Sequence, residues 1–467
     1  MTRSLAIQRA QDVLDSGALA ATLARRVRYA SESEEPQGAP VLRAYLEEEM
    51  APSLAALGFT SQLHDNPVAA GLPLLVAERI EAPGLPTVLM YAHGDVVRGQ
   101  AAQWREGLAP WDLHIEGERW YGRGTADNKG QHTVNLAALE QVIAARGGQL
   151  GFNLKLLVET GEEKGSPGLR EFCEQQREAL KADLFLASDG PRVQAARPTL
   201  FLGSRGALNF ELRLNCRERA YHSGNWGGLL ANPGIVLANA VASLVGPRGR
   251  ILVDALRPRE VPEPVRRALA DIQVGGDADD PAVDADWGEP GLTPAERVIG
   301  WNSIEILAMV AGNPAQPVGA IPGSARVFCQ MRFVVGTAVE DIVPALRAHL
   351  DAHGFQAVEI HTGASGAATR LDPEDPWVRW ALESIQRSTG KRPALLPNLG
   401  GSLPNDIFAN TLGLPTLWVP HSYPACAQHA PNEHLLAPVA REGLALMAGL
   451  FWDLGETGAA VRAARAA

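Results

Sequence analysis

The sequence has few cysteines, few aromatic residues and no long apolar run. Its 467 residues include four cysteines, and aromatic residues make up 6%. Cys173, Cys216, Cys329 and Cys426 are far apart and form no Cys-x-x-Cys pair, which is typical of reduced thiols rather than of a disulfide framework. No run of about 18 or more apolar residues occurs, so no membrane span is predicted. The first residues lack the apolar segment of a secretory signal, and we therefore expect a cytoplasmic location.

Basic residues are also in deficit. Lys and Arg total 42 against 53 Asp and Glu, which gives a formal net charge of -11. This balance repels nucleic acid and excludes it as the expected partner. It does not exclude a small anionic substrate, because an acidic protein can still carry one local cationic pocket. A small molecule is therefore the expected ligand.

The first part of the chain reads as an α/β unit. Between residues 86 and 190, strand-like segments at 86–92, 154–158 and 184–187 alternate with helical patterns, the clearest at 128–146. Polar residues follow each of these strands. Ligands of open α/β sheets collect outside the carboxyl ends of the strands, so one site could gather these side chains.

A second unit is predicted to interrupt the first. Alternating strands at 207–214 and 325–334 flank a loop-rich stretch, and helices are expected at 233–245 and 339–353. The α/β pattern of the first unit then returns, with a predicted helix at 376–388 and a strand at 416–419. We therefore expect residues 1–204 and 369–467 to form one domain, with an α+β domain inserted at 205–368. The Ala- and Arg-rich tail, 459–467, is expected to be frayed.

The adjacent carboxylates Glu162 and Glu163, which follow the strand at 154–158, are the most informative local feature. Most such pairs lie on solvated surfaces. In a metal site, by contrast, one carboxylate can bind the ion while its neighbour takes a proton from an activated water. His93 and Asp95 are two residues apart, so in an extended segment both point to one side, as when a carboxylate orients a ligating imidazole.

Further candidate ligands lie in three other motifs. Asp127 stands at the start of a helix in the glycine-rich segment 122–130, where an N-cap is the alternative. Asp189 follows a strand and could equally be a turn residue. His434 supplies a second imidazole near the C-terminus, whereas the nearby Cys426 and His429 are interpreted as pocket wall. The predicted ligand set is rich in oxygen and nitrogen and lacks thiolates. It suits two Zn²⁺ ions, with Mn²⁺ or Co²⁺ as substitutes, and therefore hydrolysis.

The order of these motifs along nearly the whole chain resembles that of the two-zinc exopeptidases that include carboxypeptidase G, aminoacylase and carnosinase. The resemblance implies a zinc-exopeptidase catalytic domain with a mixed sheet flanked by helices. It assigns one metal to His93 and Asp189, the other to Glu163 and His434, and the bridging position to Asp127. Glu162 would be the general base and later the acid, and Asp95 would orient His93. The peptide between Asp127 and Asn128 would be cis.

The same resemblance assigns roles outside the metal ligands. Residues 205–368 look like the family's lid and dimerisation domain, which implies a homodimer. His222 would reach into the partner's active site and stabilise an oxyanion, although by itself it reads as a turn histidine. Arg332 matches an arginine that grips the substrate's carboxylate, where an exposed strand arginine is the alternative. The loop of Gly400, Gly401 and Ser402 resembles a substrate-binding loop, where a plain turn is the alternative.

Two positions bear on the substrate. Asp189 resembles the dipeptidase and aminopeptidase-like branches, because deacylases and carboxypeptidases commonly have Glu there. Leu399 departs from the carnosinase-like pattern, which often has an acidic residue immediately before Gly-Gly-Ser. We expect a dipeptidase-like metallopeptidase that cleaves the amide of dipeptides or similar small substrates with a free carboxylate. An N-acyl amino acid or aromatic amide deacylase is the alternative, and a catalytically silent binding protein is a minor one.

Overall fold

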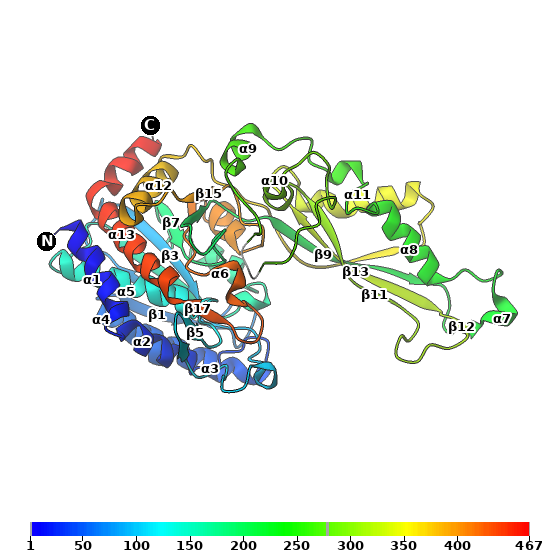
Figure 1. The fold of residues 1–467 in the computed structure, drawn as a ribbon, viewed down its shortest axis with the longest axis horizontal. Helices are drawn as coiled ribbons and strands as arrows, with labels where there is room; N and C mark the ends of the chain where they lie inside the picture. Colours follow the sequence, from blue (N-terminus) through cyan, green and yellow to red (C-terminus); the bar gives the residue numbers. More distant parts are fainter. Residues whose placement is uncertain (1, 277–279, 467) are drawn as a thin grey trace.

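A computed structural model of the chain describes residues 2–276 and 280–466. It has two units, a large one that contains both termini and a narrower one that projects from it (Figure 1). Within the described residues, no helix combines the length and the apolar character required to cross a bilayer.

The large unit is built on an eight-stranded mixed sheet. In spatial order its strands are β1 (Thr60–His64), β2 (Leu74–Arg79), β6 (Asn153–Glu159), β3 (Thr87–His93), β7 (Leu184–Ala187), β16 (Thr416–Trp418), β8 (Thr199–Phe201) and β15 (Ala394–Leu396). The central strands β6, β3, β7 and β16 run parallel to one another. Buried parallel strands read as nearly continuous apolar runs, which is why these were recognisable in the sequence.

Helices cover both faces of this sheet. Because side chains alternate across a strand, Met90 and Leu156 belong to one buried apolar cluster, whereas Leu89 and Leu157 belong to another. Helices that contribute to the first cluster are α1 (Arg3–Asp15), α2 (Ala18–Val27), α4 (Ala51–Ala56), α5 (Lys129–Ala145), α12 (Pro376–Thr389) and α13 (Ala437–Ala466). Helices that contribute to the second are α6 (Leu169–Gln175), α9 (Glu263–Leu269) and α10 (Pro294–Ile299).

The narrower unit contains a four-stranded antiparallel sheet. Its strands, in spatial order, are β11 (Ser303–Ala311), β13 (Ser324–Phe333), β9 (Gly206–Asn215) and β14 (Glu359–Gly366). Helices α8 (Pro233–Leu244) and α11 (Val339–Ala352) pack on the face that carries Leu208, Phe210 and Leu212. The alternate residues of β9 lie on the opposite face, which these helices do not cover.

The predicted fold class is confirmed, since the large sheet is mixed and flanked by helices. All strands of the second sheet lie within residues 206–366. The N-terminal helices, the strands β1 and β2 and the edge strand β11 were not predicted. The expectation of a frayed tail is wrong for residues 459–466, because they continue α13, whereas Ala467 lies outside the described residues.

Candidate active site

The polar residues that follow β3, β6 and β7 meet at one edge of the large sheet. His93, the last residue of β3, pairs with Glu159, the last residue of β6. On the other side of β3, Tyr91 pairs with Ala187, the last residue of β7. Parallel strands end at the same edge, so the loops that carry the predicted carboxylates begin side by side.

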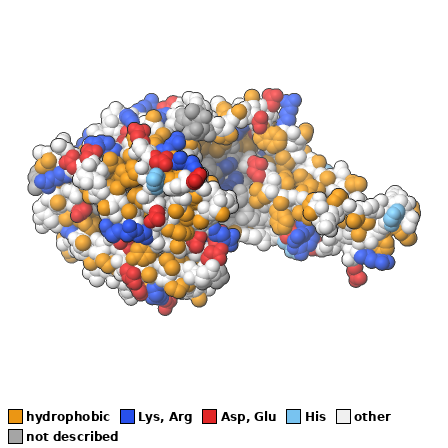
Figure 2. All heavy atoms as spheres, turned by 60° about the horizontal axis from the view of Figure 1, so that its bottom comes forward, with side chains coloured by type: hydrophobic (Ala, Val, Ile, Leu, Met, Phe, Trp, Pro, Cys, Tyr) orange, Lys and Arg blue, Asp and Glu red, His pale blue; other side chains and the backbone are white. Residues whose placement is uncertain are grey.

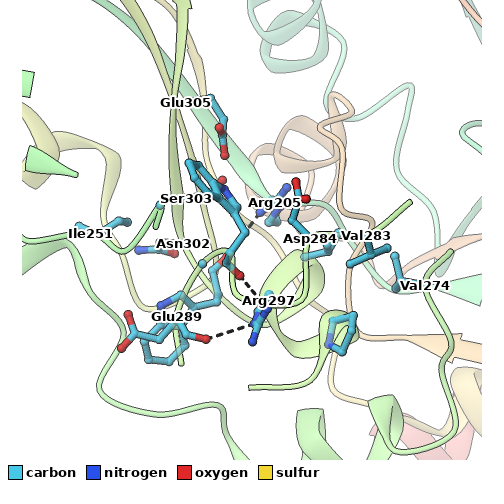
Figure 3. A pocket seen from close by; sticks show the side chains of 16 residues that line it. Arg205, Ile251, Val274, Val283, Asp284, Glu289, Arg297, Asn302, Ser303 and Glu305 are labelled. Carbon is cyan, nitrogen blue, oxygen red and sulfur yellow. Dashed lines mark hydrogen bonds between the residues drawn. The ribbon is translucent and has the colours of Figure 1, made fainter. Parts of the chain in front are cut away.

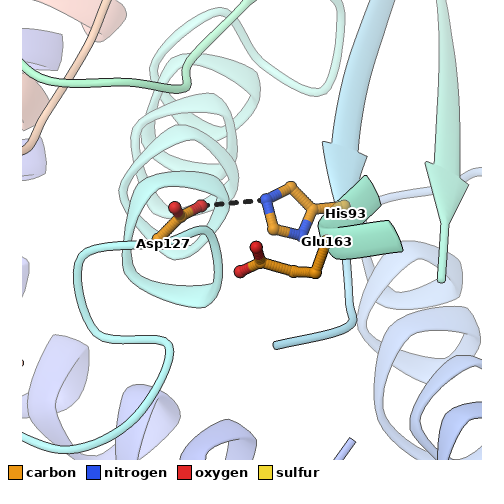
Figure 4. A group of neighbouring side chains, drawn as sticks. All are labelled: His93, Asp127 and Glu163. Carbon is orange, nitrogen blue, oxygen red and sulfur yellow. Dashed lines mark hydrogen bonds and ion pairs between the residues drawn. The ribbon is translucent and has the colours of Figure 1, made fainter. Parts of the chain in front are cut away.

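His93 is fully buried at the centre of this edge. Its Nε2 lies 2.9 Å from Asp127 Oδ1 and 3.5 Å from Asp189 Oδ2. Its Nδ1 lies 3.0 Å from the backbone oxygen of Asp95 and 3.4 Å from Asp95 Oδ1. Figure 4 shows the imidazole pointing toward Asp127, with Glu163 beside it. The predicted neighbours His93, Asp95, Asp127 and Asp189 are thus brought together.

Asp95 also connects the β3 loop to the Glu162–Glu163 loop. Its Oδ1 accepts a hydrogen bond from the Glu162 backbone N–H at 3.2 Å, and its Oδ2 accepts one from the Glu163 N–H at 3.1 Å. The carboxylate of Asp95 is fully buried. It therefore fixes the backbone from which both glutamates project, in addition to its contacts with His93.

Asp127 is held by a turn that a distant carboxylate supports. Glu433, fully buried, accepts hydrogen bonds from the backbone N–H groups of Gly124, Ala126 and Asp127. The peptide bond between Asp127 and Asn128 is cis, as the resemblance implied. The Asn128 side chain donates to the backbone oxygen of Ser188 at 2.8 Å, which ties this turn to the end of β7.

The second imidazole at the site is that of His429 and not that of His434. The Nε2 atom of His429 lies 3.1 Å from Asp127 Oδ2 and 3.1 Å from Glu163 Oε2. His434 instead begins β17 (His434–Leu436), and its Nε2 lies 2.6 Å from the hydroxyl of Tyr423. The predicted position of His434 beside Glu163 is therefore corrected, as is the interpretation of His429 as pocket wall.

The observations that favour His429 come from the structure and not from the sequence. Both histidines lie within one short segment, but pairing of β17 with β5 (Arg119–Tyr121) fixes the direction of His434. The preceding loop carries three residues with positive φ, Ala427, His429 and Asn432, and is irregular. Such loops commonly carry binding residues, which agrees with the position of His429 beside Asp127 and Glu163.

Burial of several carboxylates perturbs their acidity. Burial, followed by the charge of Asp127, raises the pKa of Glu163 to about 7 and that of Asp189 to about 7. Burial also raises the pKa of Glu162 well above its usual value. Burial acts the same way on Asp127, but hydrogen bonds from His429 and His93 outweigh it and lower the pKa of that carboxyl. The cluster therefore favours added positive charge.

These donors fit divalent metal ions. Ligand atoms of His93, Asp127 and Glu163 all lie within 4.8 Å of one another. Asp189 Oδ2 is buried and has no hydrogen-bond partner among the described residues, which leaves it available to a cation. Cys426 is not part of this set: it packs in a small apolar cluster, and burial raises the pKa of its thiol to about 12. Imidazole and carboxylate donors without thiolate suit zinc, manganese or cobalt.

Two of the predicted substrate-binding residues, Arg332 and Ser402, line a cavity beside Glu162. This cavity, of about 440 Å³, is lined by Glu162, Arg332 and Ser402 among others. Arg332 Nη1 donates to Ser402 Oγ at 2.6 Å, and Ser402 Oγ donates to the backbone oxygen of Arg205 at 2.8 Å. The backbone oxygen of Gly400 accepts from Arg205 Nε at 2.7 Å. Figure 2 shows that the molecule is hollowed between its two units, with the narrower unit on one side.

A second cavity is bordered by Arg205. It measures about 300 Å³, and Ile251, Val274 and Val283 contribute to its walls (Figure 3). None of the predicted site residues lines it. Arg205 borders this cavity and also donates to the backbone oxygen of Gly400, so it connects the wall of the second cavity to the substrate-binding loop.

Of two further predicted determinants, His222 lies away from the site and Leu399 lies beside it. His222 ends the short strand β10 (Tyr221–His222), which pairs with β12 (Ala320–Ile321) at the far end of the narrower unit, next to α7 (Ser223–Trp226) (Figure 1). It is exposed, and within one chain it does not join the other site residues. Leu399, by contrast, packs against Gly190, immediately after Asp189.

The sequence profile of peptidase family M20/M25/M40 matches residues 89–453, a span that contains all of the site residues. The chain belongs to this family. The M20 assignment confirms the resemblance drawn from the motifs, and it makes the chain a metal-dependent, dipeptidase-like hydrolase. The site described above is thus the candidate active site of an M20 peptidase.

Named relatives agree with this assignment. The chain is 30% identical over 332 residues to a cysteinylglycine-S-conjugate dipeptidase of Corynebacterium striatum, covering 68% of this chain and 70% of that one. It is 33% identical over 248 residues to the Beta-Ala-His dipeptidase of Mus musculus, covering 50% of each. The fold of the dipeptidase Dug1p from Saccharomyces cerevisiae matches with a TM-score of 0.81 at 22% identity, covering 98% of this chain and 99% of that one. An M20 metallo-carboxypeptidase from Sulfolobus solfataricus matches with a TM-score of 0.80 at 25% identity, over 94% and 99%.

Proposed function

We propose that this M20 peptidase is a two-metal dipeptidase. The observation that carries the proposal is the position of Asp127, whose two carboxylate oxygens face different imidazoles, His93 on one side and His429 on the other. Asp189 accompanies His93, and Glu163 accompanies His429. We assign one metal to His93 and Asp189, the other to His429 and Glu163, and the bridging role to Asp127. His429 thus takes the role first given to His434.

Two divalent ions, Zn²⁺ or in its place Mn²⁺ or Co²⁺, would polarise the scissile carbonyl. They would also make a water acidic enough to lose a proton and attack that carbonyl. Glu162 would accept the proton of that water and later give it to the leaving amine. Burial raises the pKa of Glu162, and a raised pKa helps this carboxyl to hold the proton between the two steps. Asp95 would hold Glu162 in place through the backbone.

Arg332 and Ser402 are the residues that favour a substrate with a free carboxylate. They line the same cavity as Glu162, and the guanidinium is the only group among these three that carries a fixed positive charge. The relatives named above are dipeptidases for cysteinylglycine conjugates and for Beta-Ala-His, so small peptides are the proposed substrates. Gly400 and Gly401 would contact the substrate through their backbone.

The second candidate function is an N-acyl amino acid or aromatic amide deacylase, and Leu399 is the observation that favours it. Its apolar side chain packs at Gly190, beside Asp189, where a carboxylate could have met a substrate ammonium. An acylated or less polar group would be compatible with this surface. Asp189 in place of Glu supports the dipeptidase. A silent binding protein is disfavoured because competent residues occupy every ligand position and the base.

A paired substrate assay separates these functions. We expect the metal-loaded protein to hydrolyse a dipeptide such as alanylglycine faster than N-acetyl-alanylglycine, and a chelator to abolish hydrolysis of both. Metal content and kcat/KM for each substrate are the measurements. A strong preference for the blocked form would make the deacylase the correct function, and absence of both bound metal and hydrolysis would leave the silent protein.

We further propose a homodimer that forms through residues 205–368 and a cytoplasmic location. The edge strand β11 exposes Leu307, Met309 and Ile306, with exposed fractions of 60%, 44% and 40%. An apolar edge strand of this kind is a candidate for pairing with a second copy. Exposed His222 would then be available to the partner's site. The four cysteines form no disulfide, as expected in a reducing compartment.

Subunit mixing tests the role of His222. Alone, Glu162→Gln and His222→Ala should each have low activity, the first through loss of the base and the second through loss of a group that serves the partner's site. Refolded or exchanged equimolar mixtures should regain up to about a quarter of normal kcat, because about half of the dimers are then mixed and each mixed dimer contains one site with both residues intact. Solution mass gives the oligomeric state, and mixtures without any regain would rule out this role.

A further inference from the structure

The side chain of Arg332 is held by two neutral groups. Its Nε donates to Gln330 Oε1 at 2.9 Å and its Nη1 donates to Ser402 Oγ at 2.6 Å. None of the ion pairs found among residues 2–276 and 280–466 involves Arg332, and burial alone lowers the pKa of its guanidinium. The arginine is thus fixed in position while its charge stays uncompensated by the protein.

Gln330 is itself fixed by a third residue. Its Nε2 donates to Asn209 Oδ1 at 2.8 Å, and the two residues are direct partners across β13 and β9. Gln330 and Arg332 are two apart on one strand, so both lie on the face of the sheet that α8 and α11 do not cover. Because Arg332 Nε can only donate, the amide of Gln330 must present its oxygen there and its nitrogen to Asn209. The orientations of the three side chains are therefore mutually determined.

The same sheet shows what a carboxylate would do at position 330. On β9, Glu211 and Arg213 are also two residues apart, and Arg213 donates to Glu211 through Nε at 3.2 Å and through Nη2 at 2.9 Å. The arginine and the glutamate there form a closed ion pair. Glutamine at 330 makes the Nε contact with Arg332 but does not cancel its charge.

We propose that Gln330, supported by Asn209, is a positioning residue that determines how Arg332 receives the carboxylate of the substrate. With its Nε edge occupied by Gln330, the guanidinium presents the Nη1 and Nη2 end to the cavity, where one Nη1–H and both Nη2–H groups remain available. A carboxylate then binds end-on, in a two-bond arrangement that arginine favours. Asn209, Gln330, Arg332 and Ser402 all line the cavity that Glu162 borders. This inference rests on the proposed carboxylate-binding role of Arg332.

Two substitutions test the inference. Gln330→Met keeps the length of the side chain but removes the strong acceptor, and Gln330→Glu keeps the acceptor but adds a charge that pairs with Arg332, as Glu211 pairs with Arg213. With alanylglycine, we expect KM to rise roughly tenfold for Gln330→Met, the range of one charge-assisted hydrogen bond, and to approach the KM of Arg332→Ala for Gln330→Glu. We expect kcat to change little in both. With alanylglycine amide, which has no carboxylate, neither variant should differ from the parent protein.

The matched control is Glu211→Gln, which breaks the equivalent pair on the same face of the sheet but outside the cavity. It should leave both substrates unaffected. A second control combines each Gln330 variant with Arg332→Ala. In this background the Gln330 substitution should cause no further rise in KM, because the guanidinium that Gln330 positions is absent. Binding of alanylglycine and its amide to the Glu162→Gln protein, measured by calorimetry, gives the same comparison without turnover.

The outcomes separate this inference from the proposed function. Hydrolysis of alanylglycine with an unchanged acid-to-amide preference in both Gln330 variants would overturn the inference and leave the dipeptidase. The inference would also be overturned if the Gln330 variants raised the KM for alanylglycine equally in the presence and in the absence of Arg332→Ala. It would likewise be overturned if the Arg332→Ala protein still preferred alanylglycine over its amide. Failure of the parent protein to hydrolyse or bind any dipeptide would instead overturn the proposed function, and the inference with it.

Discussion

Glu162→Gln should lower kcat by roughly 10²–10⁴-fold, the range that a positioned general base contributes, while the protein retains its full complement of metal. Glutamine has nearly the shape of glutamate but cannot accept a proton from water. The backbone N–H of Glu162, which donates to Asp95, is unaffected by this change, so the loop should keep its conformation. Steady-state kcat together with metal content measured on the same sample provides the test.

The neighbouring substitution, Glu163→Gln, is the matched control. It alters the same kind of side chain one residue away, and its backbone N–H also donates to Asp95. Because Glu163 contacts His429 and is assigned to a metal, this variant should lose metal first and activity as a consequence. If Glu162→Gln keeps substantial kcat at full metal occupancy, Glu162 is not the base. If instead both variants lose metal equally, the division of roles between the two glutamates is wrong.

The strand ends could be predicted from the sequence because polar residues follow directly after each buried apolar strand. The apolar strands β3, β6 and β7 each stop where polar residues begin, so the positions of His93, Glu162 and Asp189 at one sheet edge followed from the parallel arrangement. The edge strand β11 was missed for a physical reason. Several of its apolar residues are exposed, and its register with β13 shifts between Ile306 and Ala308, so it lacks the alternation that identified β9 and β13.

The C-terminal tail and the second imidazole of the site could not be predicted correctly from the local sequence pattern. Residues 459–466 have the composition of a loose end, yet they extend a helix whose earlier turns are buried between α1, α5 and α12. A helix anchored in this way can propagate beyond its packed part at little cost. The choice between His429 and His434 depended on a loop conformation and on the pairing of β17 with β5, which join residues more than 300 positions apart.

A matched pair of histidine variants should resolve which imidazole serves the second metal. His429→Ala removes a group 3.1 Å from both Asp127 and Glu163, so we expect metal affinity to fall by at least about 100-fold, beyond the range seen for supporting residues around a metal. His434→Ala removes a group that bonds to Tyr423 and to the backbone oxygen of Asn432, so it should leave metal content close to that of the parent protein.

Competition with a chelator measures the two affinities, and thermal unfolding reports whether either variant is merely destabilised. His434 is buried beside Tyr121 and Tyr423, so its removal should lower the unfolding temperature more than removal of the exposed His429. The two readouts are thus expected to move in opposite order, metal affinity with His429 and stability with His434. The reverse order in both would restore His434 as the ligand. It would also require the loop of His429 to rearrange when metal binds, since in the present geometry His429 is the imidazole that contacts Asp127 and Glu163 together.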